Sequence, residues 1–365
     1  MAMNIADMIQ KDIEKAVRGQ AGKTPKEPKK AAPKEPDFDE EASITEIVPE
    51  NENQQLFSKV FGFLPLSGID HTVTCYKQED WSVNMQTFIP KKRAEYVWQQ
   101  EALEHLAVGV EIGDNIWISG PTGSGKSTLI EQYCAYTCRP FLRFNGREDT
   151  ESAPIFGQLV AENGSTLWKD GLLTEGVKNG AMVLMDEATV IPPGIMMGLQ
   201  WLLEDEGKLM LTDKPGTVEE KITHPDSKFR LVFGDNTKGL GDDTGKYAST
   251  NVFNTATLDR FGTSIHLDYL ASAHEVEILK KKYPSLKNHM AEKMVKFAHL
   301  VRTANQQEEI SLTMSPRTLL SWAKKSLYYK NEKIALQTSF YEKLDSDSEK
   351  AFIRASYQTV FGKSF

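Results

Sequence analysis

The residues with the most distinctive chemistry stand at 120–128, where the sequence reads GPTGSGKST. This run satisfies the pattern G-x-x-x-x-G-K-[ST] of phosphate-binding loops. Its glycines let successive backbone N–H groups point at one place, and the start of a following helix adds partial positive charge there. Lys126 would bring a full charge to the β- and γ-phosphates of a nucleotide, and the Ser127 hydroxyl would ligate Mg²⁺. The predicted nucleotide-binding residues are Gly120, Pro121, Thr122, Gly123, Ser124, Gly125, Lys126, Ser127 and Thr128.

Two adjacent carboxylates follow a second apolar run, AMVLMDE at 181–187. A strand that ends in Asp186 and Glu187 places both side chains at the carboxyl edge of a sheet, where ligands of α/β proteins bind. We expect Asp186 to hold Mg²⁺ and Glu187 to orient and activate an attacking water. Alone, the string is also compatible with an ordinary strand end. Its position about 60 residues after the phosphate loop favours the functional interpretation, and two adjacent acidic residues favour a hydrolase over a small-molecule kinase.

Two polar residues beyond these motifs are candidates for contact with the γ-phosphate. The run FRLVFGDN at 229–236 reads as a strand, and if it lies beside the Asp186 strand, Asn236 reaches the attacking water. The alternative is a turn-forming Asn.

About 24 residues later, Arg260 stands in LDRF, just before another predicted strand. We expect Arg260 to face out of its own subunit and to neutralise phosphate charge in a neighbour. The alternative is a surface pair with Asp259.

A last arginine lies near the start of a predicted helix, in MSPRTLLSWA at 314–323. Ser315 is the expected N-cap and Pro316 the first helical residue, which leaves Arg317 in the first turn. A cation there is unfavourable for the helix dipole, so an anion such as ATP phosphate is expected nearby. Arg317 would then link the position of this helix to the nucleotide. The alternative is an exposed arginine without a role.

The elements that must position these residues alternate between apolar strands and helical segments up to about residue 270. Strand candidates are NIWISG, PFLRFN, AMVLMDE, FRLVFGDN and SIHLDYL. Such alternation predicts a parallel sheet covered on both faces. We expect an amphipathic helix at 1–18, a disordered linker rich in Pro, Lys and Glu at 19–45, a segment leading into the core at 46–110, an α/β core at 111–270 and helices at 271–365.

Composition narrows the function classes. The net charge of −8 argues against a surface that is basic throughout, so nucleic acid is an unlikely partner, and only the runs KTPKEPKK and KKKYPSLKNH favour it. No stretch of about 20 apolar residues exists, and the N-terminus lacks the apolar core of a secretion signal. The three cysteines match no zinc pattern. We expect a cytoplasmic protein with no membrane association.

Together these motifs resemble the MoxR-like branch of the AAA+ ATPases, and within it the small ATPase subunits of aerobic cobaltochelatases. The resemblance covers about 55–335. It rests on GPTGSGKST, MDEATVIPPGIMMGLQWLLEDEGKL, FRLVFGDNTKGLGDDTGKY, LDRF and MSPRT. Residues 155–173 resemble the helix-2 insert hairpin of this branch, and 208–229 its next hairpin. Residues 1–45 are not part of the family pattern.

The resemblance implies a P-loop AAA+ core, with a parallel sheet flanked by helices, followed by a small all-helical lid. It implies ATP hydrolysis with Mg²⁺, hexameric rings, and a protein partner with a von Willebrand A-type domain that the ring remodels. Asp186 and Glu187 would serve magnesium and hydrolysis, Asn236 would be sensor 1, Arg260 the arginine finger and Arg317 sensor 2. A cobaltochelatase ATPase subunit in cobalamin synthesis and a nucleic-acid-linked ATPase are the alternatives. No stretch of the chain suggests a cobalt or tetrapyrrole site.

Overall fold

The computed structural model describes residues 49, 51–237 and 253–365. The predicted N-terminal helix and linker lie outside the described residues, as does the loop of the family resemblance from Lys238 onward. From residue 46 to the C-terminus the chain forms one compact unit.

A five-stranded sheet in the order β11-β3-β10-β7-β4 forms the core, and its strands are all parallel. This confirms the predicted α/β fold. The register brings strand ends together, because Asn145 pairs with Asp186 and Asp235 pairs with Ser119. The strands are β3 (Ile116–Ser119), β4 (Phe141–Asn145), β7 (Met182–Asp186), β10 (Arg230–Asp235) and β11 (Thr263–His266).

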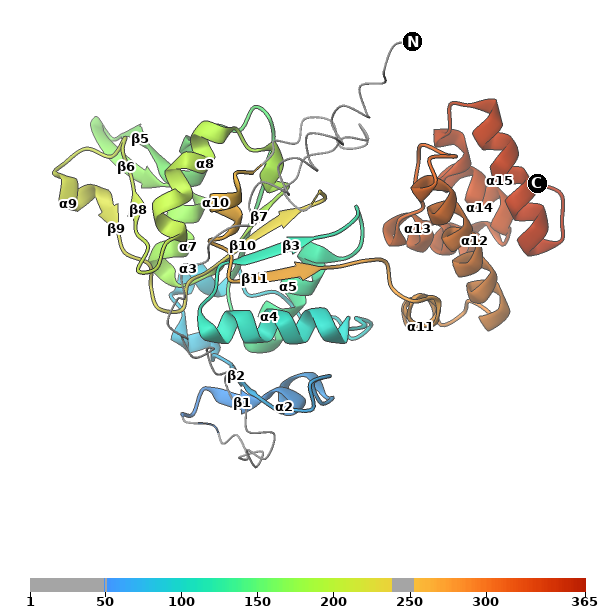
Figure 1. The fold of residues 1–365 in the computed structure, drawn as a ribbon, viewed down its shortest axis with the longest axis horizontal. Helices are drawn as coiled ribbons and strands as arrows, with labels where there is room; N and C mark the ends of the chain where they lie inside the picture. The colour runs from blue at the N-terminus through green and yellow to red at the C-terminus, as the bar shows by residue number, and fades with distance from the viewer. Residues whose placement is uncertain (1–48, 50, 238–252) are drawn as a thin grey trace, which may run out of the picture. The chain divides into compact units, whose positions relative to one another are not determined.

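Strand β7 shows why both faces of the sheet are covered. Its side chains alternate in direction, so Met182 and Leu184 join one hydrophobic cluster while Val183 and Met185 join another. All four are fully buried. The first cluster includes side chains of α4 (Gln100–Ile112) and α5 (Lys126–Thr137), and the second includes those of α7 (Leu172–Asn179) and α8 (Pro193–Leu199). The two helix pairs cover opposite faces (Figure 1).

Two hairpins project from this core. The first pairs β5 (Gly157–Glu162) with β6 (Ser165–Asp170), and the second pairs β8 (Leu209–Met210) with β9 (Ile222–Thr223), at the positions where the sequence resembled the family's two insert hairpins. The remaining elements before residue 262 are short: β1 (Gln54–Leu56), α2 (Phe57–Phe61), β2 (Thr72–Thr74), η1 (Gln78–Asp80), α3 (Val83–Gln86), α6 (Ala153–Phe156), η2 (Ala188–Val190), η3 (Gln200–Leu203), α9 (Val218–Lys221) and α10 (Thr255–Leu258).

The residues after 270 form helices around a hydrophobic cluster of their own, centred on the buried Phe297 and Trp322. We call residues 271–365 the lid. This helical region agrees with the predicted architecture, whereas the exact domain bounds stay predictions. Its elements are α11 (Ser272–Lys282), α12 (Asn288–Gln306), α13 (Pro316–Tyr329), α14 (Glu332–Ser339), η4 (Tyr341–Lys343) and α15 (Asp347–Phe361).

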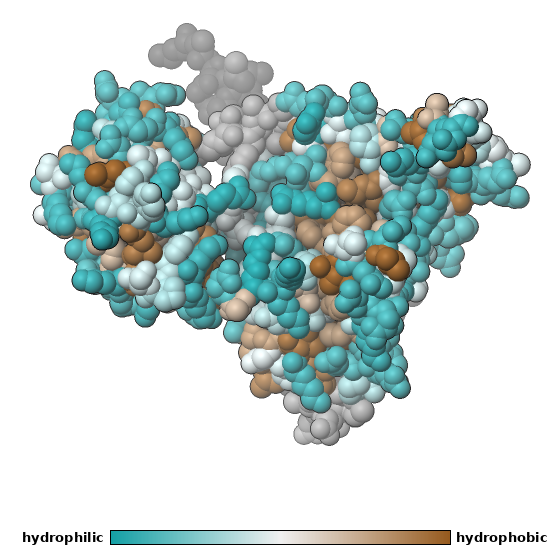
Figure 2. All heavy atoms as spheres, turned by 180° about the vertical axis from the view of Figure 1, so that it is seen from behind, coloured by the Kyte–Doolittle hydropathy of each residue, from teal (hydrophilic) through white to brown (hydrophobic). Residues whose placement is uncertain are grey.

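The face drawn in Figure 2 is mainly hydrophilic, with hydrophobic patches between the polar side chains. Large exposed apolar side chains on the molecule include Leu64, Leu66, Met197 and Tyr328. Within the described part of the chain, every helix is too short or too polar to span a lipid bilayer.

Candidate active site

The phosphate loop lies between β3 and α5, as its sequence predicted. Gly120 has φ 146°, and a Cβ atom there would lie 1.9 Å from the Leu267 carbonyl oxygen, so only glycine fits. Helix α5 begins at Lys126, whose side chain turns back over the loop and donates from Nζ to the Gly120 carbonyl oxygen at 2.6 Å. The loop therefore has the strand-to-helix geometry in which backbone N–H groups and a lysine can surround phosphate.

A chain of three side chains crosses the carboxyl ends of β7 and β10. Lys126 Nζ donates to Asn236 Oδ1 at 2.7 Å, and Asn236 Nδ2 donates to Glu187 Oε2 at 2.6 Å. Glu187 has φ 54°, in the left-handed region that costs free energy for a residue with a side chain. Asn236 therefore connects the predicted phosphate-binding lysine to the predicted catalytic carboxylate.

Burial shifts the pKa values of Lys126 and Glu187, the two ends of this set of hydrogen bonds. Desolvation lowers the pKa of Lys126, although the negative charges of Asp186 and Glu187 act in the opposite direction. Desolvation raises the pKa of Glu187, while the hydrogen bond from Asn236 lowers it. A carboxylate whose pKa is raised is a stronger base, which suits activation of water.

Asp186 ends β7 and is buried, with an ion pair between its Oδ2 and Nη2 of Arg143 at 2.6 Å. Arg143 belongs to β4, the neighbouring strand, and was not among the residues predicted from the sequence. The available signal was a lone charged residue inside the apolar run PFLRFN. Arg143 therefore occupies the carboxylate that is expected to hold magnesium.

The oxygen atoms at this site fit a magnesium ion of the kind that nucleotide enzymes use. Such ions take one or two protein oxygens and complete their shell with phosphate oxygens and water. The Ser127 hydroxyl and the buried Asp186 carboxylate are hard oxygen donors that line one cavity. No group of three or more His, Cys, Asp or Glu side chains that could hold a metal alone occurs among the described residues.

Helix α13 of the lid begins against the phosphate loop. A Cβ atom on Gly123 would lie 2.8 Å from the Cβ of Ser315. Ser315 is the N-cap, with its hydroxyl accepting from Thr318 N at 3.3 Å, and Pro316 follows as the first helical residue. Arg317 is exposed, and within the described residues it forms no ion pair, so its charge is available to a ligand.

One cavity of about 480 Å³ collects most of the predicted residues. Thr122 to Thr128, Asp186, Glu187, Asn236 and Arg317 all line it. Its apolar lining comes from Tyr96, Val97, Leu270, Ile278 and Leu320. The volume lies in the range of ordinary small-ligand sites, and the apolar side chains suit a planar base. These five were not predicted from the sequence, because no local pattern relates Tyr96 and Val97 to residues 270–320.

Arg260 lies apart from this cavity. It lines a different one, of about 1130 Å³, with Glu204 and Asp259 among its neighbours. Its Nη2 lies 3.2 Å from Glu204 Oε1, and Nη1 donates to the Ala256 carbonyl oxygen at 2.9 Å and to Gln200 Oε1 at 3.3 Å. Arg260 thus does not reach the nucleotide site of its own chain, and its action on a neighbour stays a prediction.

Comparisons with known proteins agree with this geometry. Residues 115–261 match the family model described as AAA domain (dynein-related subfamily). Residues 275–355 match the model described as CbbQ/NirQ/NorQ C-terminal. The first match contains the phosphate loop, the two carboxylates, Asn236 and Arg260, and the second contains Arg317.

Three relatives with similar sequences indicate the branch of the family to which the chain belongs. The aerobic cobaltochelatase subunit CobS of Sinorhizobium sp is 31% identical over 75% of this chain and 83% of its own length. Protein NorQ of Paracoccus denitrificans is 25% identical over 78% of this chain and 97% of its own. The von Willebrand factor A domain-containing protein 8 of Mus musculus is 20% identical over 60% of this chain and 12% of its own. With its phosphate loop, paired carboxylates and helical lid, the chain belongs to the MoxR-like AAA+ ATPases, close to CobS, and is an enzyme that binds and hydrolyses ATP.

Proposed function

We propose that the chain works as an ATP-driven subunit of a ring that remodels a protein partner. The observation that carries this proposal is the distribution of the predicted residues. Lys126, Asp186, Glu187, Asn236 and Arg317 line one cavity, whereas Arg260 lies in another. Because the family resemblance assigns Arg260 to the γ-phosphate and Arg260 does not line this cavity, a second copy of the chain would have to supply it.

Within the cavity each side chain has a role that its contacts support. Lys126 and the loop backbone hold the β- and γ-phosphates, and Ser127 and Asp186 hold magnesium, which neutralises phosphate charge when bound. Glu187, with its raised pKa, accepts a proton from the attacking water. Asn236 donates to Glu187 and accepts from Lys126, so a change in the position of the lysine alters the hydrogen bond that orients the base.

The test of hydrolysis uses Glu187→Gln. This variant keeps the shape of the side chain but removes the base, so we expect tight ATP binding, a stable assembly by light scattering, and loss of turnover. Normal turnover in this variant would overturn the assignment of Glu187.

The test of the trans role mixes two inactive variants. Arg260→Ala should lose activity, since it leaves the neighbour's phosphate without its cation. In a mixture with Glu187→Gln, some Arg260→Ala sites receive an intact arginine and regain activity. The matched control mixes Arg260→Ala with the double variant Glu187→Gln/Arg260→Ala, which has no arginine to offer. Equal rates in the two mixtures would contradict the trans role.

For the partner we propose a protein with a von Willebrand A-type domain. The support is the similarity of this chain to a segment of a mouse protein whose name states that it contains such a domain. Retention of such a protein by Glu187→Gln with ATP, and its release with ADP, would support this partner, while retention that ignores the nucleotide would contradict it.

The second candidate is the ATPase subunit of a cobaltochelatase, favoured by the 31% identity to CobS across 83% of that protein. The chain would be added in place of CobS to the other purified subunits of a cobaltochelatase. Restored cobalt insertion, absent with Glu187→Gln, would support this candidate. No insertion, with normal ATPase activity, would favour the more general proposal.

A further inference from the structure

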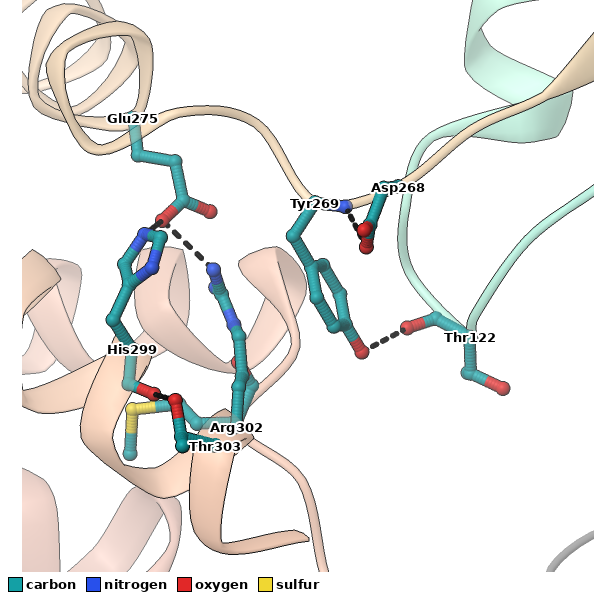
Figure 3. A network of polar contacts seen from close by, with 8 residues as sticks. Thr122, Asp268, Tyr269, Glu275, His299, Arg302 and Thr303 are labelled. Carbon is teal, nitrogen blue, oxygen red and sulfur yellow. Dashed lines mark hydrogen bonds and ion pairs between the residues drawn. The ribbon is translucent and has the colours of Figure 1, made fainter. Parts of the chain in front are cut away.

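A tyrosine between the core and the lid touches the phosphate loop directly. Tyr269 lies between the end of β11 and the start of α11. Its hydroxyl donates to the Thr122 carbonyl oxygen at 3.2 Å (Figure 3). Thr122 is a loop residue that lines the nucleotide cavity, so this bond connects the lid's attachment point to the nucleotide site.

The ring of the same tyrosine contacts a buried cation of the lid. The guanidinium carbon of Arg302, on α12, lies 4.3 Å from the ring centroid of Tyr269. Arg302 is only 3% exposed, and its Nη1 pairs with Glu275 Oε2 at 2.9 Å. Its Nη2 is buried and has no hydrogen-bond partner in the described structure. The aromatic face therefore compensates part of a charge that the hydrogen bonds leave unsatisfied.

The same guanidinium fixes the start of the helix that carries Arg317. Arg302 Nε donates to the Met314 carbonyl oxygen at 2.7 Å. Met314 immediately precedes Ser315, the N-cap of α13, and Arg317 lies in the first turn. A continuous set of contacts thus runs from Thr122 through Tyr269 and Arg302 to the backbone just before α13, the helix that carries Arg317.

We propose that Tyr269 is a positioning residue that sets the lid, and with it Arg317, relative to the phosphate loop. This inference rests on the proposed role of Arg317 as a phosphate contact. Tyr269 touches the carbonyl side of Thr122 and does not itself line the cavity, so it acts through Arg317. Its hydroxyl is hydrogen-bonded to the phosphate loop, and its ring packs against the Arg302 guanidinium.

The expected effect follows from population arithmetic. When only a fraction of molecules holds Arg317 in its binding position, the apparent Kd rises by the inverse of that fraction. Tyr269→Phe keeps the ring against Arg302 but removes the bond to Thr122. The loss of one partly exposed hydrogen bond corresponds to a change of about 2- to 10-fold in such an equilibrium.

The experiment is a double-mutant cycle on the affinity of the full chain for a non-hydrolysable ATP analogue with Mg²⁺. Arg317→Ala alone should weaken binding at least 10-fold, because a charge-assisted contact is lost. Tyr269→Phe should raise Kd by about 2- to 10-fold in the wild-type background and by less than 2-fold in the Arg317→Ala background. Tyr283→Phe is the control, since within the described residues the hydroxyl of this lid tyrosine has no hydrogen-bond partner and Tyr283 lies outside the cavity.

The outcomes separate two failures. An unchanged Kd for Arg317→Ala would overturn the proposed role of Arg317. A normal loss for Arg317→Ala, combined with a Tyr269→Phe effect of the same size in both backgrounds, would overturn the positioning role and leave the proposed function standing. An effect of Tyr283→Phe equal to that of Tyr269→Phe would also overturn it, because any lid tyrosine would then serve.

Discussion

The buried ion pair between Arg302 and Glu275 offers a sharp test of how the lid is held together. Both side chains are almost fully enclosed, with 4% and 2% exposure. Replacing Arg302 by methionine keeps a long side chain in the space but leaves the Glu275 carboxylate buried. Among the described residues, only His299, whose Nε2 lies 3.1 Å from Glu275 Oε2, would remain as its partner.

The expected cost comes from stranding this carboxylate. Breaking a buried ion pair by removing one partner typically costs about 3–5 kcal/mol, since the remaining charge is neither solvated nor paired. Arg302→Met also removes the bond from Nε to the Met314 carbonyl oxygen. The double variant Glu275→Leu/Arg302→Met removes both charges, and we expect it to recover most of the lost stability.

Hydrogen exchange of lid peptides is the suitable assay, because it reports local opening separately from the core. A loss of about 3 kcal/mol corresponds to roughly 100-fold faster exchange in α12 and α15, with little change in the central strands. Lys296→Met is the matched control, since Lys296 lies exposed on the same helix. Exchange in Arg302→Met as slow as in Lys296→Met would refute the reasoning, and so would a double variant less stable than the single one.

Three further predictions concern the nucleotide site. Asn236→Ala removes a hydrogen bond that lowers the pKa of Glu187, so this pKa should rise. The acidic limb of the plot of kcat against pH should then move to higher pH, and a shift to lower pH would contradict this. Gly123→Ala places a Cβ against α13 and should weaken nucleotide binding in titrations, whereas Gly62→Ala, with similar φ and open space, should not; equal losses would contradict the contact. Arg143→Gln removes a half-exposed competitor for the magnesium-binding carboxylate, so nucleotide binding should need about 2- to 5-fold less Mg²⁺; a higher requirement would contradict this.

The parts of the site that sequence predicted are those with a local cause. The phosphate loop needs glycine at positions such as Gly120, where the carbonyl oxygen of Leu267, the residue after β11, leaves no room for a Cβ atom. Asp186 and Asn236 follow apolar runs, and parallel strands bring such run ends to one edge. The Ser-Pro start of α13 likewise depends on neighbouring residues alone.

The parts that sequence missed depend on contacts between distant segments. Arg143 reaches the site because β4 pairs with β7, and no residue near Arg143 indicates that pairing. Tyr269 and Arg302 are 33 positions apart in the sequence and meet only through the packing of α11 on α12. A tyrosine in a linker and an arginine in a helix have no spacing rule that relates them.

The contacts of Arg260 bear on whether this arginine can serve a neighbouring subunit. Its ion pair with Glu204 is long, at 3.2 Å, and the two side chains are 27% and 50% exposed. Pairs this exposed contribute about 0–1 kcal/mol, because water screens them and holding two long side chains costs entropy. A triphosphate presented by a second copy carries more charge than one carboxylate and would attract the guanidinium more strongly. The contact with Glu204 therefore holds Arg260 near one orientation but is weak enough to break. The side chain could then turn toward a triphosphate on a second copy, as its proposed role requires.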